Sequence, residues 1–485
     1  MKTTSLKKNA ILSVVKQILK VAFPLITFPY VSRILLEDNL GKYNFTLSII
    51  SYFSIFAALG INAYAIREGA RIRDDKQKLE AFASEIFTIN LITTVLSYLA
   101  LFSLYMCWPK LHGYTLLLFV QSLTIIAGTL GVDWINSIFE DFEYMTKRYI
   151  FVKCLALIAI FLFIKNESDY VLYAGINSCV EILASVMNIF YVRRYVHVKM
   201  TKRLRLCVHI KPMLILFANS LAIIVYTNAD MTMLGIYKGD AEVGVYSVAS
   251  KMYQIAKTLT NAVTIVMVPR LAALLGDNNK KRYAELIKKT IKTIATFMFP
   301  MIAGIFLLSD EIILFLGGVT FIYGSTSLKI LSIALIPVCI GGIFFDGVLI
   351  VNRKEKLCFL ITLLSASINI LLNIFLIPWI GINGAAITTL VAELINCIAS
   401  IIFSNKYYEK IHAMDFDGIS VFVGVVCIIM SCVYLKQSLN GYIYSAVCIC
   451  VCAVEYFAVL LFLKNSILRS LLDSFKRKVK KGDLS

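Results

Sequence analysis

The 485-residue sequence has little charge: only 16% of its residues are Asp, Glu, Lys or Arg, whereas a soluble globular domain carries about 25%. It is also poor in proline, histidine and tryptophan, with 8, 4 and 3 residues respectively. In contrast, 59% of its residues are hydrophobic and its mean hydropathy is +0.79. A chain with so few polar groups cannot cover a water-facing surface, which excludes a soluble globular protein.

Motifs for catalysis are missing as well. The sequence contains no G-x-x-x-x-G-K-[ST] phosphate loop, no H-E-x-x-H pair and no Cys/His cluster with metal-binding spacing. No polar connection is longer than about two dozen residues, which leaves no room for a soluble catalytic domain. We therefore expect no catalytic residues, no metal, no cofactor and no enzyme activity.

The 12 cysteines and 4 histidines do not form a recognisable pattern. None of the cysteines falls in an expected outer loop, so no disulfide framework is indicated. Cys448, Cys450 and Cys452 are interpreted as small apolar residues of the last span. All the histidines, including His209, fall in expected loops, and a histidine relay within the membrane is therefore not supported.

Apolar segments of roughly 20 residues recur along the whole chain, separated by short polar connections. They predict an all-α polytopic membrane protein with about 14 transmembrane helices, since a helix satisfies its own backbone groups in lipid. The first segment follows "MKTTSLKKNAILSVV", which resembles a signal peptide. Lys16 and Lys20 interrupt it and no small-residue cleavage site follows, so we expect a retained first span.

The net charge of +18 could suggest nucleic acid, but its placement indicates a membrane. Lysine and arginine favour alternate connections by about seven to one, as on the cytoplasmic side of membrane proteins. The bias predicts a multi-pass protein with both termini cytoplasmic. The basic segments, such as "KRKVKK", then need only contact with anionic membrane lipids, and no nucleic acid partner is expected.

The two halves of the chain show a weak internal repeat. An offset of 203 residues aligns three identical pairs at equivalent places of span 2, expected near 44–66, and span 8, expected near 244–268. The pairs are Gly41 with Gly244, Tyr43 with Tyr246, and Arg67 with Arg270. Because the paired spans run in the same direction, the repeat is parallel and predicts two pseudo-symmetric six-helix lobes. The expected divisions are an N-lobe at 1–192, a basic linker at 193–211, a C-lobe at 212–404, two further helices at 405–463 and a basic tail at 464–485.

Polar side chains form helix faces inside the expected spans. Ionisable groups in the hydrocarbon layer are costly and usually face a wet cavity or a partner helix. Span 8 carries a basic and amide-rich stripe at helical spacing, and the repeat offset places two serines of span 2 opposite it. The candidate substrate path therefore consists of Lys16, Lys20, Arg33, Ser48, Ser51, Lys251, Gln254, Lys257, Thr258 and Asn261. For Lys16 and Lys20, snorkelling to the inner surface is an equal alternative.

Acidic residues also lie within the spans. Asp133, Glu181, Asp230 and Glu393 are candidates for counter-charges to the lysines or for sites of a coupling ion, H⁺ or Na⁺. For Asp230 the counter-charge role is favoured, because a lysine-rich stripe without substrate needs compensation. Structural pairing between helices is the alternative for all of them.

Several segments, taken together and in order over about residues 9–404, resemble Wzx-type flippases of lipid-linked oligosaccharides in the multidrug/oligosaccharidyl-lipid/polysaccharide (MOP) exporter superfamily. They are "FPLITFPYVSRIL", "LGKYNF", "IREGARIRDD", "GVDWINSIFEDFEY", "YTNADMTMLG", "GVYSVASK" and "VPRL". The resemblance implies a V-shaped, MATE-like transporter that turns an undecaprenyl-diphosphate-linked glycan across the bacterial cytoplasmic membrane by alternating access. Positions matching the family's charged motifs are Arg33, Asp133, Asp230, Lys251 and Arg270. After Asp133 and Trp134, "INSIFEDF" departs from the aromatic and Gln-containing segment usual in the family.

The residues and the resemblance agree on a flippase for surface polysaccharide biosynthesis, such as O-antigen or capsule. A diphosphate that leaves water needs cationic and hydroxyl partners, which the stripe of span 8 would supply. A polymerase and other glycan-assembly proteins are further expected partners. Two alternatives remain: a multidrug cation antiporter of the same superfamily, and a membrane polymerase or glycosyltransferase of the same glycan pathway.

Overall fold

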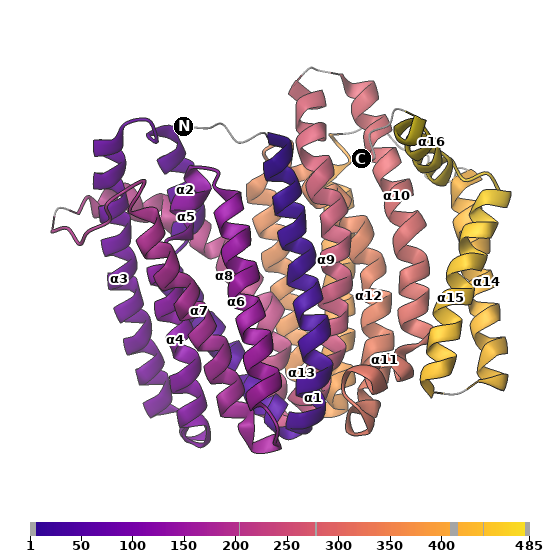
Figure 1. Cartoon of the computed structure of the whole chain (residues 1–485), viewed down its shortest axis with the longest axis horizontal. Helices are drawn as coiled ribbons and strands as arrows, with labels where there is room; N and C mark the ends of the chain where they lie inside the picture. Colours follow the sequence, from indigo (N-terminus) through magenta and orange to yellow (C-terminus); the bar gives the residue numbers. More distant parts are fainter. Residues whose placement is uncertain (1–5, 203, 277–278, 408–415, 440, 481–485) are drawn as a thin grey trace. The chain divides into compact units, whose positions relative to one another are not determined.

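The computed structural model describes residues 6–202, 204–276, 279–407, 416–439 and 441–480, which are organised as helices and short connections (Figure 1). The chain divides into two compact units, residues 1–247 and 248–485, and the division falls inside α9 (Asp240–Gly276). The first unit also contains α1 (Leu6–Ala58), α2 (Ile61–Arg71), α3 (Lys76–Cys107), α4 (Thr115–Gly131), α5 (Asp133–Ile138), α6 (Phe142–Phe163), α7 (Tyr170–Val192) and α8 (Leu206–Tyr237).

The second unit continues from α9 with a similar series of helices. They are α10 (Lys280–Leu307), α11 (Ser309–Leu316), α12 (Ser325–Phe344), a π-helical turn η4 (Phe345–Ile350), α13 (Glu355–Ser404), α14 (Phe416–Ser438), α15 (Gly441–Phe462) and α16 (Ser466–Lys480). Short 3₁₀ turns, Pro109–Tyr114, Glu167–Asp169 and Val319–Gly324, connect some of the longer helices of both units.

Ten helical stretches of the described residues are long and apolar enough to cross a membrane, which makes the chain an all-helical, multi-pass membrane protein. Two of the longest are broken by non-helical backbone. In α1 the break is at Leu36, with φ 58° and ψ 177°, and in α13 it is at Ile380 and Gly381. The helix passes through Pro24 and Pro29 and breaks seven residues after the second proline.

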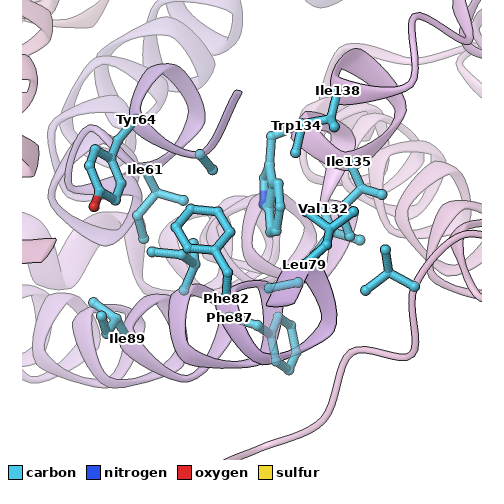
Figure 2. Close-up of a cluster of buried hydrophobic side chains, with 14 of the residues drawn as sticks. Ile61, Tyr64, Leu79, Phe82, Phe87, Ile89, Val132, Trp134, Ile135 and Ile138 are labelled. Atoms are coloured by element: carbon cyan, nitrogen blue, oxygen red, sulfur yellow. The ribbon is translucent and has the colours of Figure 1, made fainter. Parts of the chain in front are cut away.

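A hydrophobic core in the first unit joins α2, α3 and α5 (Figure 2). Trp134, Ile135 and Ile138 of the short α5 pack with Phe82 of α3 and Ile61 of α2. The segment "INSIFEDF", which departs from the family pattern after Asp133 and Trp134, therefore contributes Ile135 and Ile138 to this core. Burial of an aliphatic or aromatic side chain of this kind stabilises a fold by about 1.5–3 kcal/mol.

Helix α8 packs on the second half of α1 through polar contacts and small residues. The Thr232 hydroxyl lies 2.8 Å from Ser48 Oγ and 2.9 Å from Tyr52 Oη, and Gly235 provides the space for the Phe45 ring. Near the end of α8, Lys110 Nζ donates to the carbonyl of Gly235, which the helix itself leaves without an N–H partner. These contacts hold α8 within the first unit.

The two glycines of the internal repeat, Gly41 and Gly244, lie where the backbones of α1 and α9 come close together. A Cβ on Gly41 would stand 1.7 Å from the Asp240 carbonyl oxygen, and a Cβ on Gly244 would stand 1.9 Å from the Glu37 carbonyl oxygen. Beside them, the Tyr114 hydroxyl donates to Asp240 at 2.9 Å, and burial is the main factor that raises the pKa of the Asp240 carboxyl above its ordinary value. Only glycine permits this close approach of α1 and the start of α9.

Replacing Gly244 with alanine is expected to destabilise the first unit by about 1–3 kcal/mol, because backbone atoms must move to admit the methyl group. The measurement is thermal unfolding of the purified protein in detergent. Gly342→Ala in α12 is the matched control, since nothing lies within 4 Å of a Cβ at that helical position. Equal melting temperatures for the two variants would show that the close approach is not needed.

In the second unit, buried polar groups join the two halves of α13 across its break. Thr388 Oγ1 donates to Asn373 Oδ1 at 2.5 Å, and Asn373 Nδ2 donates to Asn369 Oδ1 at 3.2 Å. All three side chains are buried. Because an unpaired amide in this environment would be costly, the three residues stabilise one packing of the two half-helices.

Candidate functional site

The first unit contains a cavity of about 470 Å³ that is bordered by two of its three predicted acidic residues, Asp133 and Glu181. Its other polar lining comes from α1, α2, α3, α4 and α7, through Ser54, Asn62, Asn90, Thr124, Thr129 and Ser185. Hydroxyl, amide and carboxylate groups from six helices therefore converge on one space. Such a lining suits water, a cation or the polar part of a substrate.

Asp133 begins α5 and is held by a buried cation. Arg148 of α6 donates from Nη2 to Asp133 Oδ1 at 2.6 Å, and Asn188 of α7 donates to the same oxygen at 3.0 Å. The Arg148 side chain is only 7% exposed, whereas that of Asp133 is 49% exposed at the cavity. Asn136 donates in turn to Asn188 Oδ1 at 2.6 Å, so the carboxylate is positioned by α6 and α7 together.

Glu181 is also paired, but more loosely. Its Oε1 lies 2.9 Å from Lys153 Nζ of α6, and its side chain is 51% exposed. The ion pair joins α6 to α7 at the edge of the same cavity. Because both partners retain contact with solvent, the pair can open at little cost.

Asp230 lies outside the cavity and is buried on α8. Its Oδ2 accepts a hydrogen bond of 2.7 Å from the hydroxyl of Tyr246, a residue that the internal repeat matches with Tyr43. The bond ties α8 to the first turns of α9 within the first unit.

In the second unit, two of the predicted residues meet. Lys257 Nζ of α9 lies 2.5 Å from Glu393 Oε1 of α13, and the Tyr253 hydroxyl donates to the same oxygen at 2.8 Å. Glu393 is buried, while 31% of the Lys257 side chain is exposed. Lys257, a candidate for the substrate path, and Glu393, a candidate counter-charge, therefore form an ion pair in which the lysine remains partly exposed.

The remaining path residues take different positions. Gln254 and Asn261 are exposed on α9, while Lys251 and Thr258 are partly buried there. Ser48 is buried in the contact between α1 and α8, Ser51 donates to the Ser48 carbonyl at 2.6 Å, and Arg33 is exposed on α1. The predictions for the side chains of Lys16 and Lys20 lie outside the described residues. For all of them, the functional assignment stays a prediction.

A buried polar network that the sequence did not reveal lies near the start of α8. His209 Nε2 is 3.0 Å from Glu85 Oε2 of α3, its Nδ1 is 2.8 Å from the Tyr64 hydroxyl, and Arg205 binds Glu85 at 3.1 Å. An imidazole protonated on Nε2 satisfies both of its contacts. The prediction that His209 falls in a loop was wrong, because α8 begins at Leu206 rather than at Pro212.

Glu85 was not among the candidate residues, and it is buried. Its only sequence signal was a single acidic residue in an apolar helix, and its partners are more than a hundred residues away. Glu85, Tyr64 and the neighbouring pair Arg205 and His209 come from three segments that only the folded chain brings together. The network joins α3 and α2 to the start of α8.

The fold resembles that of known transporters. The structure titled "Lipid II flippase MurJ, inward closed conformation" superposes with a TM-score of 0.75 at 16% identity, covering 95% of this chain and 99% of that chain. An inward-facing multidrug resistance MATE family transporter of the MOP superfamily gives a TM-score of 0.61 at 13% identity, covering 82% and 97% of the two chains. At these identities the likeness shows a shared MurJ/MATE-like fold.

The sequence comparison identifies the family. The chain belongs to the polysaccharide biosynthesis protein family, whose model matches residues 6–275, and a second model, MatE, matches residues 216–375. A protein of Escherichia coli K12 named "Putative O-antigen transporter" is 23% identical over 403 residues, covering 80% of this chain and 94% of the relative. The capsular polysaccharide biosynthesis protein CapF of Staphylococcus aureus is 21% identical, covering 76% and 92%. The predicted membership in the Wzx-like branch of the MOP superfamily is thereby confirmed.

Proposed function

We propose that the protein is a flippase that moves undecaprenyl-diphosphate-linked glycan repeat units across the bacterial cytoplasmic membrane. The names of its relatives, an O-antigen transporter, a capsular polysaccharide protein and an archaeal glycan flippase, support this class of substrate. We further propose about 14 spans in two six-helix lobes plus two C-terminal helices, with both termini cytoplasmic. The breaks at Leu36 and Gly381, which divide two very long helices, support the higher count.

The Lys257–Glu393 pair is the observation that carries the proposal. A cation within a predicted span is held by a buried carboxylate at 2.5 Å and remains partly exposed. A diphosphate that approaches offers Lys257 a stronger partner than a single carboxylate, since two or more anionic oxygens can accept its three N–H bonds. When the substrate leaves, Glu393 takes the lysine back. Lys257 therefore has an anionic partner in both states, and Glu393 keeps the hydrogen bond from the Tyr253 hydroxyl while the lysine is on the phosphate.

Coupling to an ion is assigned to Asp133 and Glu181, the acidic residues of the cavity in the first unit. The cavity lined by Asp133 and Glu181 offers carboxylate and hydroxyl oxygens, which are ligands suited to H⁺ or Na⁺. Likeness to a MATE fold is consistent with cation coupling in this chain. Asp230 has a hydroxyl partner in Tyr246 and is assigned the role of counter-charge, with ion coupling as the alternative.

The Asp230→Asn variant separates these two roles. As a counter-charge, its loss is expected to slow flipping by about 10-fold under every imposed gradient, corresponding to about 1.4 kcal/mol. As a coupling site, its loss removes the response to one gradient and leaves flipping without a gradient unchanged. The measurement is glycan flipping in proteoliposomes with separate H⁺ and Na⁺ gradients, and Tyr246→Phe controls for the lost hydrogen bond alone. Normal flipping under all gradients would exclude both roles.

The proposal is tested most directly in liposomes. Purified protein is reconstituted with a fluorescent undecaprenyl-diphosphate-linked glycan, and translocation is followed by protection of the label from an impermeant quencher. Flipping that depends on the protein supports the proposal. Export of lipophilic cations without glycan flipping would instead identify a multidrug antiporter.

In cells, the remaining alternative is distinguished by the intermediate that accumulates after deletion of the gene. Lipid-linked repeat units retained at the inner leaflet indicate a missing flippase, whereas units that are exported but not polymerised indicate a missing polymerase or glycosyltransferase. The paired charges on α9 and α13 favour the first outcome, because an enzyme would need reactive groups at the outer surface.

A further inference from the structure

Three cysteines that are separate in the sequence meet in the second unit. Cys432 belongs to α14, and Cys448 and Cys452 lie one turn apart on α15, which packs beside α14 (Figure 1). The Sγ atom of Cys432 is 2.8 Å from that of Cys448 and 3.5 Å from that of Cys452, and the latter two are 3.8 Å apart. All three side chains are buried. Their convergence is a feature that neither transport nor topology requires.

The donor atoms of this cluster consist of sulfur alone. The three Sγ atoms lie within 4.8 Å of one another, and no His, Asp or Glu belongs to the group. A separate cavity of about 240 Å³, lined by the three cysteines together with mostly apolar residues of α10, α14 and α15, borders the thiols. Thr296, Pro300 and Tyr456 form part of its wall. An ion that sheds its water can therefore reach the sulfurs, while hydrated ions are disfavoured by the apolar lining.

The chemistry of the donors selects the metal. Thiolates are soft ligands that prefer Cu(I), Zn(II) and iron–sulfur clusters, and the last two ordinarily require four protein ligands. With metal–sulfur bonds of about 2.3 Å, a trigonal site separates its sulfurs by about 4.0 Å. Small rotations about χ1 would bring the observed separations of 2.8–3.8 Å to that value. A three-thiol set is thus suited to a monovalent ion that accepts three-coordination.

We propose that Cys432, Cys448 and Cys452 bind one Cu(I) ion between α14 and α15. The ion displaces two thiol protons to solvent, so that two thiolates and one neutral thiol coordinate it with a net charge of −1. The metal remains Cu(I) throughout and the step needs no oxidant or reductant. A net charge of −1 costs less to desolvate in an apolar surrounding than the −2 of a complex with three thiolates. The bound ion links the two C-terminal helices, which are joined by only a short connection.

The test uses the full-length protein in nanodiscs, titrated anaerobically with Cu(I) against a chromogenic Cu(I) chelator. One ion per chain is expected, with X-ray absorption showing three sulfur neighbours. Cys432→Ser/Cys448→Ser/Cys452→Ser is expected to weaken binding by more than about 100-fold, because hydroxyl groups are poor ligands for soft metals. Cys427→Ser/Cys450→Ser, on the same two helices but outside the cluster, is the matched control and should change affinity less than about 2-fold.

X-ray absorption of the unsubstituted protein keeps the test independent of how well the serine variant folds. Coordination by nitrogen or oxygen, the absence of stoichiometric Cu(I) binding, or equal losses in the cluster and control variants would overturn the proposal. So would preferential binding of Zn(II), or a Cys432–Cys448 disulfide found by mass spectrometry in protein purified under reducing conditions. Glycan flipping is not used as a readout, so failure of the proposed transport function leaves this result unaffected.

Discussion

Lys251→Met/Lys257→Met is expected to lower glycan flipping by more than about 100-fold while the protein remains folded in the membrane. A hydrogen bond to a charged group contributes about 1.5–3 kcal/mol, so two lost lysine–phosphate contacts account for at least this decrease. Lys257 is partly exposed on α9 and pairs with Glu393 at 2.5 Å, whereas Lys251 lies partly buried six residues earlier. The measurement is the initial rate of glycan translocation in proteoliposomes at equal protein content.

Two controls separate loss of the cation from loss of the fold. Lys280→Met/Lys281→Met removes the same charge from the exposed start of α10 and should leave flipping within about 2-fold of normal. Lys257→Met/Glu393→Gln removes both members of the ion pair, so that no charge is left buried without a partner. Recovery of flipping in this second variant would show that Lys257 is structural and does not bind substrate.

The Asp133→Ala variant is expected to destabilise the first unit by about 2–3 kcal/mol. Arg148 is nearly buried, and without Asp133 its guanidinium loses the carboxylate that compensates it at 2.6 Å. This loss of stability is smaller than the roughly 3–5 kcal/mol lost when one partner of a fully buried ion pair is removed, because Asp133 is half exposed to the cavity. Thermal unfolding in detergent, compared with the unsubstituted protein, measures the effect.

The chain provides a matched comparison at the same cavity. Glu181→Ala removes a carboxylate whose pair with Lys153 is more exposed and is expected to cost at most about 1 kcal/mol. Asp133→Ala/Arg148→Met removes both charges and should recover much of the lost stability. If the double variant is as unstable as Asp133→Ala alone, the uncompensated guanidinium is not the cause.

The helical, membrane-spanning character of the chain could be predicted from the sequence, because apolar runs of span length have few alternatives in a bilayer. The glycines at 41 and 244 were also found from their repeated position, and both lie at a close approach of α1 and α9. Local signals of this kind depend on neighbouring residues and on the membrane as solvent. They do not depend on the tertiary structure.

Ion pairs could not be predicted in the same way. Lys257 and Glu393 are 136 residues apart, and each was identified separately as a charge within a span. Arg148 was not among the candidate residues, although it is the buried partner of Asp133. The choice of partner depends on which helix faces meet, and in a single sequence neither hydropathy nor spacing contains that information.

The attachment of α8 has a consequence for experiments that observe motion. Near one end of this helix His209 contacts Glu85 and Tyr64, and near the other Lys110 caps its carbonyls, all within the first compact unit. The boundary of a compact unit therefore need not coincide with the boundary of an internal sequence repeat. A pair of spectroscopic labels on α3 and α8 should keep a constant separation through the transport cycle.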